Sequence, residues 1–483
     1  MAAEFKSNLA AASVPLRHAW EHTVGSGRAV LALRADWRLH LRRAHAELGF
    51  RHIRFHGLLD DDMGTLICQD DKALYSFFNA DQIYDYLLSI GMKPFVELSF
   101  MPAMLGSGGS TVFKYRANVT PPKDYRHWGT LIDKLTRHWI DRYGPGEIGK
   151  WFFEVWNEPN LKAFWTGGKK GYYELYRTTV ETIKSVDSAL KVGGPASAQN
   201  AWIPEFLDYC DKHQLPADFV STHYYPTDAF GKIGADTLTQ LQHASRDIMK
   251  KRAKTAHAQA RGLPLYYTEW NVSSNPRDPL HDQSFSAAFA ANIALSVDAF
   301  VEGYSFWTFT DIFEENFFSS IPFHGGFGLL NIHGIPKPIY RAFQLLHGLG
   351  DKLYPVEGRH DTVNVWVSRG KDVVTVFLTN LAMPRHEICT VSVQVQLAQL
   401  PRPLSAHVMR IDEDHVNPRR VWQEMGEPEY LNTHDVETLQ AASTLNPVPY
   451  PLRILENCVE FSISMPPQSI AVLKIECAPE STA

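Results

Sequence analysis

Short apolar runs alternate with longer amphipathic segments from about His18 to about Gly350. The runs KPFVELSF and DFVSTHYY are almost continuous in apolar residues, which is typical of parallel strands that are covered on both faces. We expect eight such strands, at His18–Val24, His52–His56, Pro94–Phe100, Trp151–Trp156, Lys191–Gly194, Phe219–Tyr224, Leu265–Glu269 and Tyr304–Phe309.

The segments between these strands carry apolar residues at intervals of three and four, the period of a helix with one buried face. The clearest of them are Leu31–Leu48, Ala80–Ile90, Tyr125–Tyr143, Tyr172–Asp187 and Ser284–Val301. This alternation favours parallel β/α architecture, for which a doubly wound open sheet is the competing fold. Eight repeats and polar strand ends favour closure, so we predict a (β/α)8 TIM barrel over residues 15–349.

The pattern changes after about Gly350. The segments that follow are short, alternating or β-branched, and include TVNVWVS, DVVTVFLTN, VSVQVQL, CVEFSISM and SIAVLKIE. These segments predict an antiparallel β-sandwich domain at the C-terminus, over residues 350–483. With the barrel, this gives a chain of the α/β class. We expect residues 1–14 to pack on the sandwich domain. The polar, Pro-interrupted segment from about Asp412 to Pro451 is expected to leave the sandwich as a long excursion with one short helix.

The composition limits which binding partners and which cellular compartment we expect. With 45% hydrophobic and 21% charged residues, the chain is typical of a globular protein with a sizeable core. A formal net charge of -6 without a Lys/Arg run argues against a nucleic acid or a membrane surface as partner, and no apolar stretch reaches the roughly 18 residues that span a bilayer. Five cysteines without C-x-x-C spacing, and a start without a signal-peptide pattern, predict a cytoplasmic location. The oligomeric state stays open, with a homo-oligomer among the alternatives.

Two of the expected strands end in carboxylates. The run WFFEVWNEPN carries Glu158 and the run LYYTEWN carries Glu269. A polar loop start would look similar, but an apolar strand has no packing reason to finish in this way. These are strands four and seven, whose carboxyl ends point into the same mouth of a closed barrel. Hydrolysis of a glycoside needs such a pair, because one carboxyl protonates the leaving oxygen while the other is ionised.

Polar and aromatic residues close other strands. A cationic Arg54 would keep a neighbouring nucleophile ionised, although a buried structural ion pair is the alternative. Tyr225 could donate a hydrogen bond to the same carboxylate, and Trp307 is either a platform for sugar stacking or a core residue.

His56 and His223 rank behind the two glutamates, because a lone histidine is more often a core residue than a ligand. Glu314 and Glu315 lie in the loop after the eighth strand, where they could bind sugar hydroxyls or simply face solvent. The chain carries no H-E-x-x-H, G-x-x-x-x-G-K-[ST] or G-x-S-x-G motif, so we expect neither a metal nor a cofactor.

The sequence resembles glycoside hydrolase family 39, and within it the β-xylosidase branch, over nearly the whole chain. The Asn-Glu-Pro element alone is shared by many families of the same clan, so the resemblance rests on a combination of segments: FRHIRFHGLLDDDMG, KPFVELSFMPAMLGSG, NVTPPKDY, WFFEVWNEPNL, DFVSTHYY, TEWN, FWTFTDIFEE and FHGGFGLLNIHGIPKP.

The resemblance implies roles for individual residues. Glu158 corresponds to the acid/base, Glu269 to the nucleophile, and Asn157 to the residue that binds the sugar 2-hydroxyl. The remaining correspondences are positions that hold the terminal sugar, at His56, His223, Glu314 and Glu315, and aromatic walls, at Phe113 and Trp307. The family's xylosidases often carry a tyrosine shortly after the nucleophile, whereas the sequence VSSN follows Glu269-Trp-Asn here. This difference concerns the contacts that the protein makes around the leaving group.

Together these residues predict a retaining, exo-acting β-xylosidase that releases xylose from the non-reducing end of short xylo-oligosaccharides or from aryl xylosides, as in xylan degradation. A retaining mechanism implies a carboxyl separation of about 5–5.5 Å. The alternatives are an α-L-iduronidase or another glycosidase of the same family, and a non-catalytic carbohydrate-binding barrel. A metal-dependent barrel hydrolase is the remaining rival, and it would lose activity on chelation.

Overall fold

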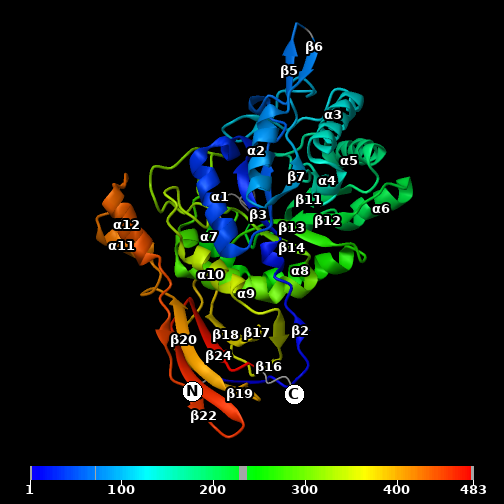
Figure 1. Cartoon of the computed structure of the whole chain (residues 1–483). Coiled ribbons are helices and arrows are strands. Elements are labelled where there is room, and N and C mark those ends of the chain that lie inside the picture. Colours follow the sequence, from blue (N-terminus) through cyan, green and yellow to red (C-terminus); the bar gives the residue numbers. More distant parts are fainter. Residues whose placement is uncertain (1–2, 71, 228–235, 480–483) are drawn as a thin grey trace.

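The computed structural model describes residues 3–70, 72–227 and 236–479. A ring of helices around a closed sheet forms one part of the molecule, and two further sheets form the other (Figure 1). Both chain termini lie at the end of the molecule that these two sheets occupy. No helix among the described residues is both long and apolar enough to cross a membrane.

Eight parallel strands form a closed barrel, which confirms the predicted TIM barrel and rejects the open sheet. Closure comes from the pairing of Phe306 in the last strand with Val24 in the first. The strands are β3 (Thr23–Arg28), β4 (His52–His56), β7 (Lys93–Leu98), β10 (Phe152–Val155), β11 (Lys191–Ser197), β12 (Phe219–His223), β13 (Leu265–Trp270) and β14 (Gly303–Phe306).

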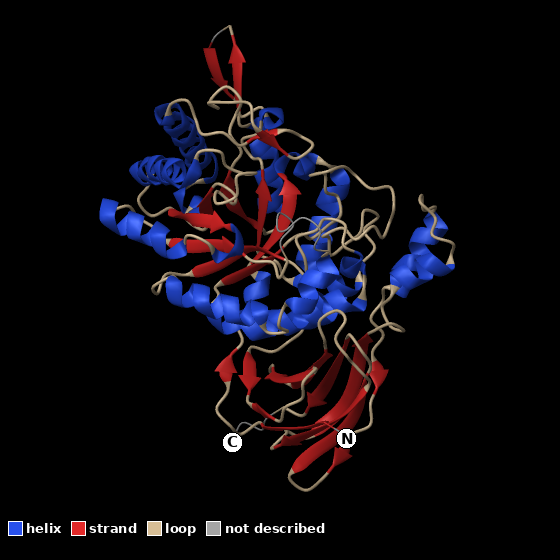
Figure 2. Cartoon of the chain, turned by 180° about the vertical axis from the view of Figure 1, so that it is seen from behind, coloured by secondary structure: helices blue, strands red, loops and turns tan. Residues whose placement is uncertain are grey.

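The helices that surround the barrel cover its outer, apolar surface (Figure 2). They are α1 (Ala35–Leu48), α2 (Phe78–Ser89), α3 (Tyr125–Tyr143), α4 (Pro145–Ile148), α5 (Gly168–Val186), α6 (Ile203–His213), α7 (Thr237–His243), α8 (Ile248–Gln259), α9 (Ser284–Val297) and α10 (Pro338–His347). Two small hairpins extend from the loops, namely β5 (Leu66–Gln69) with β6 (Lys72–Tyr75), and β8 (Thr111–Val112) with β9 (Ala117–Asn118). The β5–β6 hairpin projects away from the body of the molecule (Figure 1).

The first barrel strand lies later in the chain than its predicted position at His18–Val24. Residues Ala19–Glu21 form a short 3-10 helix, and the strand has the sequence TVGSGR. Its glycines make room for aromatic rings, since a Cβ on Gly25 would lie 2.6 Å from Cε3 of Trp307. The strand lacks the apolar pattern of the others, because the side chain of Trp307 supplies the packing surface.

One end of the barrel is closed by aromatic packing. The rings of Phe95 and Phe152 stack with their centroids 5.0 Å apart, and Phe219 and Tyr266 complete a buried cluster with them. These residues lie near the starts of their strands. A cavity inside the barrel can therefore open only at the carboxyl ends of the strands.

The C-terminal part is a β-sandwich with its own apolar core. One sheet has the order β16-β1-β19-β23-β22 and the other the order β2-β15-β17-β18-β24-β20-β21. Their strands are β1 (Ala3–Asn8), β2 (Val14–Pro15), β15 (Lys352–Tyr354), β16 (Val356–Glu357), β17 (Val363–Arg369), β18 (Val373–Asn380), β19 (Val391–Ala398), β20 (Pro403–Ile411), β21 (Val448–Pro449), β22 (Arg453–Ile454), β23 (Cys458–Met465) and β24 (Ser469–Cys477).

The pairing in the sandwich is antiparallel except at one place. The N-terminal strand β1 pairs in parallel with β19, with Phe5 beside Val395. The strand β20 was not among the predicted segments, because its sequence PLSAHVMRI alternates only from Leu404 to Val408 before Met409 and Arg410 interrupt the pattern.

The excursion between β20 and β21 contains two helices, α11 (Pro418–Glu424) and α12 (Thr433–Ala442), where the sequence predicted one. Asn432 and Asp435 form a capping box that starts α12. Trp422 and Leu439 pack against Phe323 in the long loop that follows β14. The excursion therefore supports a loop at the mouth of the barrel.

Candidate active site

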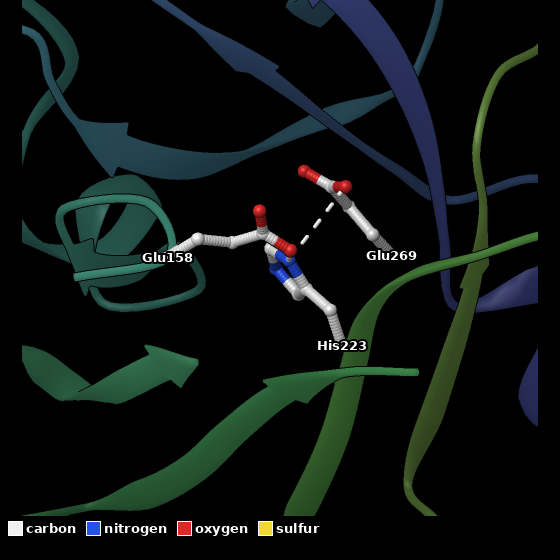
Figure 3. A group of neighbouring side chains, drawn as sticks. All are labelled: Glu158, His223 and Glu269. Carbon is white, nitrogen blue, oxygen red and sulfur yellow. Dashed lines mark hydrogen bonds and ion pairs between the residues drawn. The ribbon is translucent and has the colours of Figure 1, made fainter. Parts of the chain in front are cut away.

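Glu158 and Glu269 meet at the carboxyl end of the barrel. Glu158 follows β10 in a tight turn, where its own φ is 44° and its backbone N–H donates to the carbonyl of Ala196. Glu269 lies near the end of β13, and both residues are buried. Their side chains point toward one place, together with His223 from β12 (Figure 3). One oxygen of each carboxylate and one ring nitrogen of His223 all lie within 4.8 Å of one another.

Two donors hold the carboxylate of Glu269. Nη1 of Arg54 lies 2.7 Å from Oε1, and the hydroxyl of Tyr225 donates to Oε2 at 2.9 Å. Hydrogen bonds to the charged form stabilise an ionised carboxylate. Glu269 is thereby arranged as the anionic member of the pair.

Arg54 is the centre of a fully buried charge cluster. Besides Glu269, its guanidinium contacts Glu154 at 2.5 Å and Glu97 at 2.8 Å, and it donates to Oδ1 of Asn157 at 2.9 Å. Arg54 therefore matches both predictions, because it contacts the predicted nucleophile Glu269 and also forms buried structural ion pairs. The same contacts orient Asn157, whose side chain lines the cavity beside Glu158.

Glu97 and Glu154 also belong to the site and were not predicted from the sequence. Each interrupts an apolar strand, in KPFVELSF and WFFEVW, and an acidic residue at a fully buried strand position needs a counter-charge. That requirement is the signal that could have identified them. Burial alone would raise the pKa of Glu97, but Arg54 and His56 outweigh it, and the pKa is lowered.

Glu158 has the opposite character to Glu269. Burial, followed by the nearby negative charge of Glu269, raises the pKa of Glu158 well above its usual range. Its Oε1 lies 3.0 Å from Nδ1 of His223. A carboxyl whose pKa is raised thus faces a carboxyl that is held by Arg54 and Tyr225, which is the arrangement needed for proton donation at one and attack at the other.

His56 and Glu315 lie side by side at the edge of the cavity. Nδ1 of His56 is 2.7 Å from Glu97, and its Nε2 is 3.7 Å from Glu315. Burial opposes a charged His56, but the Glu97 carboxylate outweighs it, and the pKa of His56 is raised. Burial raises the pKa of Glu315 to about 8. Both residues can therefore carry a proton toward a ligand near neutral pH.

Glu314 faces a different way from Glu315. Its Oε1 lies 3.2 Å from Nε of Arg28, and it does not line the cavity that Glu315 lines. Arg28 is itself nearly buried and lies over the ring of Tyr115 at 4.0 Å. The structure thus brings Glu315 into the cavity of the two catalytic candidates and leaves Glu314 paired with Arg28.

Aromatic rings form the walls of the cavity. The rings of Trp307 and Phe113 lie 4.7 and 6.1 Å from that of His56. The backbone N–H of Lys114 donates to the carbonyl of Glu315 at 2.7 Å, which joins the loop of Phe113 to the loop of Glu315. The two predicted aromatic walls therefore enclose one space together with the predicted polar residues His56, Asn157, Tyr225 and Glu315.

The cavity has a volume of about 360 Å³. Gln199 lines it but was not predicted, and its side-chain amide donates to the carbonyls of Tyr225 and Thr227. Ser274, from the stretch that departs from the family pattern, also lines it. The described residues that line the cavity include no Lys and no Arg: His56, Val112, Phe113, Asn157, Glu158, Leu161, Phe164, Ala198, Gln199, Tyr225, Thr227, Glu269, Ser274, Pro276, Trp307, Glu315, Asn316 and Phe327.

Glu158, His223 and Glu269 offer a donor set that a divalent metal could use. The guanidinium of Arg54, however, lies 2.7 Å from Glu269 and would repel a cation there. The arrangement of the charges fits the chemistry of a carboxyl pair better than metal binding.

A parallel eight-stranded barrel with a buried carboxyl pair at the ends of its fourth and seventh strands defines a glycoside hydrolase. The chain belongs to glycosyl hydrolases family 39, whose family model matches residues 5–454. It is 48% identical to a β-xylosidase from Caldicellulosiruptor saccharolyticus over 95% of each chain. It is 38% identical to a β-xylosidase from Geobacillus stearothermophilus, over 96% of this chain and 94% of the relative.

A solved structure shares the whole architecture. The monomeric β-xylosidase from Caulobacter crescentus CB15 is 33% identical and aligns over 99% of this chain and 100% of its own, with a TM-score of 0.87. The predicted fold class and the predicted family are both confirmed.

Proposed function

We propose that the protein is a retaining, exo-acting β-xylosidase that releases xylose from the non-reducing end of short xylo-oligosaccharides. The observation that carries the proposal is the carboxyl pair of Glu158 and Glu269, with oxygens within 4.8 Å of each other in a buried pocket. Inverting enzymes need a separation of about 6.5–9.5 Å to admit a water molecule, whereas direct attack needs about 5–5.5 Å.

The proposed reaction has two steps. Glu269 attacks the anomeric carbon while Glu158 transfers its proton to the leaving oxygen, so that the glycosidic bond breaks and a glycosyl ester forms. Glu158, now ionised, then takes a proton from water, the resulting oxygen nucleophile attacks the same carbon, and Glu269 leaves as a carboxylate. The configuration at the anomeric carbon is retained, and the acid is again protonated.

The chemistry of the pocket supports a neutral sugar as the substrate. A uronide, the substrate type of an α-L-iduronidase, carries a carboxylate, for which Arg or Lys is the usual partner, and neither is among the described residues that line the cavity. A volume of about 360 Å³ is at the small end of ligand pockets and suits one terminal sugar. The two curated relatives named above are β-xylosidases, which agrees with a xyloside.

A time course of p-nitrophenyl β-xyloside hydrolysis, followed by ¹H NMR, tests substrate and stereochemistry together. We expect β-xylose as the first product, before mutarotation, and no turnover of the matching α-L-iduronide. The Glu269→Gln variant should be inactive, and the Glu302→Gln variant, altered at an exposed ion pair with Arg17, serves as the matched control. Unchanged turnover in Glu269→Gln, or none in the unaltered protein, would favour a non-catalytic carbohydrate-binding barrel.

We also propose a cytoplasmic location and a role in the breakdown of xylan fragments. The support is that the five cysteines are all free thiols. Cell fractionation with activity staining tests the location, and light scattering tests whether copies associate into the homo-oligomer that the sequence left open.

A further inference from the structure

His223 lies between the carboxyl of Glu158 and a hydroxyl at the floor of the site. Its Nδ1 is 3.0 Å from Oε1 of Glu158, and its Nε2 is 3.1 Å from Oγ1 of Thr268. Burial, with Arg54 and His56 nearby, lowers the pKa of His223 well below its usual range. A neutral imidazole has one N–H, so it donates in one of these contacts and accepts in the other.

The hydroxyl of Thr268 decides which nitrogen carries the hydrogen. Thr268 donates its single proton to Oε1 of Glu154, at 2.7 Å. The pKa of Glu154 is raised, mainly by burial, and the ion pair with Arg54, whose Nε lies 2.5 Å from the other oxygen of Glu154, opposes that rise and favours the carboxylate. Toward His223, the oxygen of Thr268 can therefore only accept. The hydrogen of the imidazole lies on Nε2, and Nδ1 presents its lone pair to Glu158.

We propose that Thr268 and Glu154 are positioning residues that hold His223 with its hydrogen on Nε2, so that Nδ1 accepts a hydrogen bond from the protonated form of Glu158. The inference rests on the proposed function, in which Glu158 is the acid/base. A protonated Glu158 gains an acceptor from this arrangement, whereas an ionised Glu158 faces a lone pair. The chain of hydrogen bonds thus stabilises the acid before the first step, and makes the ionised Glu158 a stronger base for water in the second.

Other charged groups act on the same two residues. Glu269, Glu315 and Glu97 disfavour an ionised Glu158, and Arg54 favours it. Arg54 and His56 face His223, and Tyr225 donates to Glu269. None of these groups is changed by a substitution at Thr268. A change in the ionisation of Glu158 in such a variant therefore reports on the hydroxyl.

The Thr268→Val variant removes the hydroxyl with little change of shape. Nε2 then has no acceptor, and His223 gains by carrying its hydrogen on Nδ1, where it can donate to Glu158 at 3.0 Å and toward Glu269 at 3.6 Å. The basic limb of the kcat/KM profile for p-nitrophenyl β-xyloside should move to lower pH by about one unit. At a pH above the basic limbs of both proteins, this shift corresponds to a loss of about tenfold in kcat/KM. Thr268→Ser keeps the hydroxyl and should restore the original limb.

Two further measurements separate this role from a purely structural one. The loss should be largest for poor leaving groups and smallest for 2,4-dinitrophenyl β-xyloside, whose departure needs little protonation. A ¹³C NMR titration of the Glu158 carboxyl, identified by its disappearance in Glu158→Gln, should show the same downward shift of pKa without any turnover. Thr268→Ala, which lacks the hydroxyl and adds no bulk, should show it as well and serves if the valine variant does not fold.

The outcomes distinguish the inference from the function on which it rests. If the unaltered protein hydrolyses the xyloside and the limbs of all Thr268 variants superimpose on it, the positioning role is refuted and the function stands. If the unaltered protein does not hydrolyse xylosides, the proposed function fails, and the NMR titration still decides whether Thr268 controls the ionisation of Glu158.

Discussion

The buried carboxyl of Glu315 provides a test that joins stability to function. Its pKa is raised by burial from 4.5 to about 8, and its side chain is 14% exposed. The folded state therefore prefers the neutral acid, while the unfolded chain ionises near its ordinary pKa. The energetic cost of this mismatch is absent below the ordinary pKa, grows as the pH rises toward 8, and is constant above that value.

The Glu315→Gln variant keeps the shape of the side chain and removes its charge. Since each pKa unit corresponds to about 1.4 kcal/mol, the shift predicts that the variant is more stable than the unaltered protein by up to about 3 kcal/mol at pH 7. The difference should fall to nearly zero at about pH 4.5. A stabilising substitution inside a pocket would mark Glu315 as a residue retained for ligand binding at the expense of stability.

Urea unfolding of both proteins between about pH 4.5 and 8 measures the difference directly. Glu314→Gln is the matched control, because the adjacent glutamate pairs with Arg28 at 3.2 Å. Loss of that ion pair should leave stability unchanged or lower at every pH. An unaltered or reduced stability of Glu315→Gln at pH 7, or a difference that does not depend on pH, would refute the reasoning.

Three other substitutions test separate parts of the site. Glu158→Gln should lower kcat/KM for p-nitrophenyl β-xyloside by about 10²–10⁴ through loss of the acid, and equal losses for 2,4-dinitrophenyl β-xyloside would contradict that role. Arg54→Met leaves Glu97, Glu154 and Glu269 without their buried counter-charge and should lower the free energy of unfolding by about 3–5 kcal/mol, whereas a variant as stable as the parent would disprove the dependence. Gly25→Ala places a Cβ 2.6 Å from the ring of Trp307, and should raise KM and cost about 1–3 kcal/mol of stability; unchanged KM and tryptophan fluorescence would speak against this packing.

The barrel could be predicted from the sequence because its strands and helices have distinct periods, and a parallel strand such as β12 is buried along its whole length. The prediction of β3 failed where Gly25 and Gly27 replace side chains with space for rings from elsewhere in the chain. That relation between residues far apart in the sequence leaves no local pattern. The strand β20 was missed for a local reason, since Met409 and Arg410 interrupt a short alternation of polar and apolar residues.

The two glutamates at the strand ends could be proposed from the sequence, because barrel geometry alone brings such positions together. Their surroundings could not be derived in the same way. Glu314 and Glu315 are neighbours in sequence and look alike, yet only the folded loop turns one toward Arg28 and the other toward His56. The contacts of Thr268 likewise exist only because the closed barrel brings side chains of β10, β12 and β13 together in its interior.

Covalent trapping tests the central claim most directly. A 2-deoxy-2-fluoro-β-xyloside with a good leaving group should form a stable ester, because the fluorine slows both steps while the leaving group permits the first. Peptide mass mapping should then place one fluoroxylosyl group on Glu269. A label on another residue, or hydrolysis with inversion and no label at all, would contradict the account.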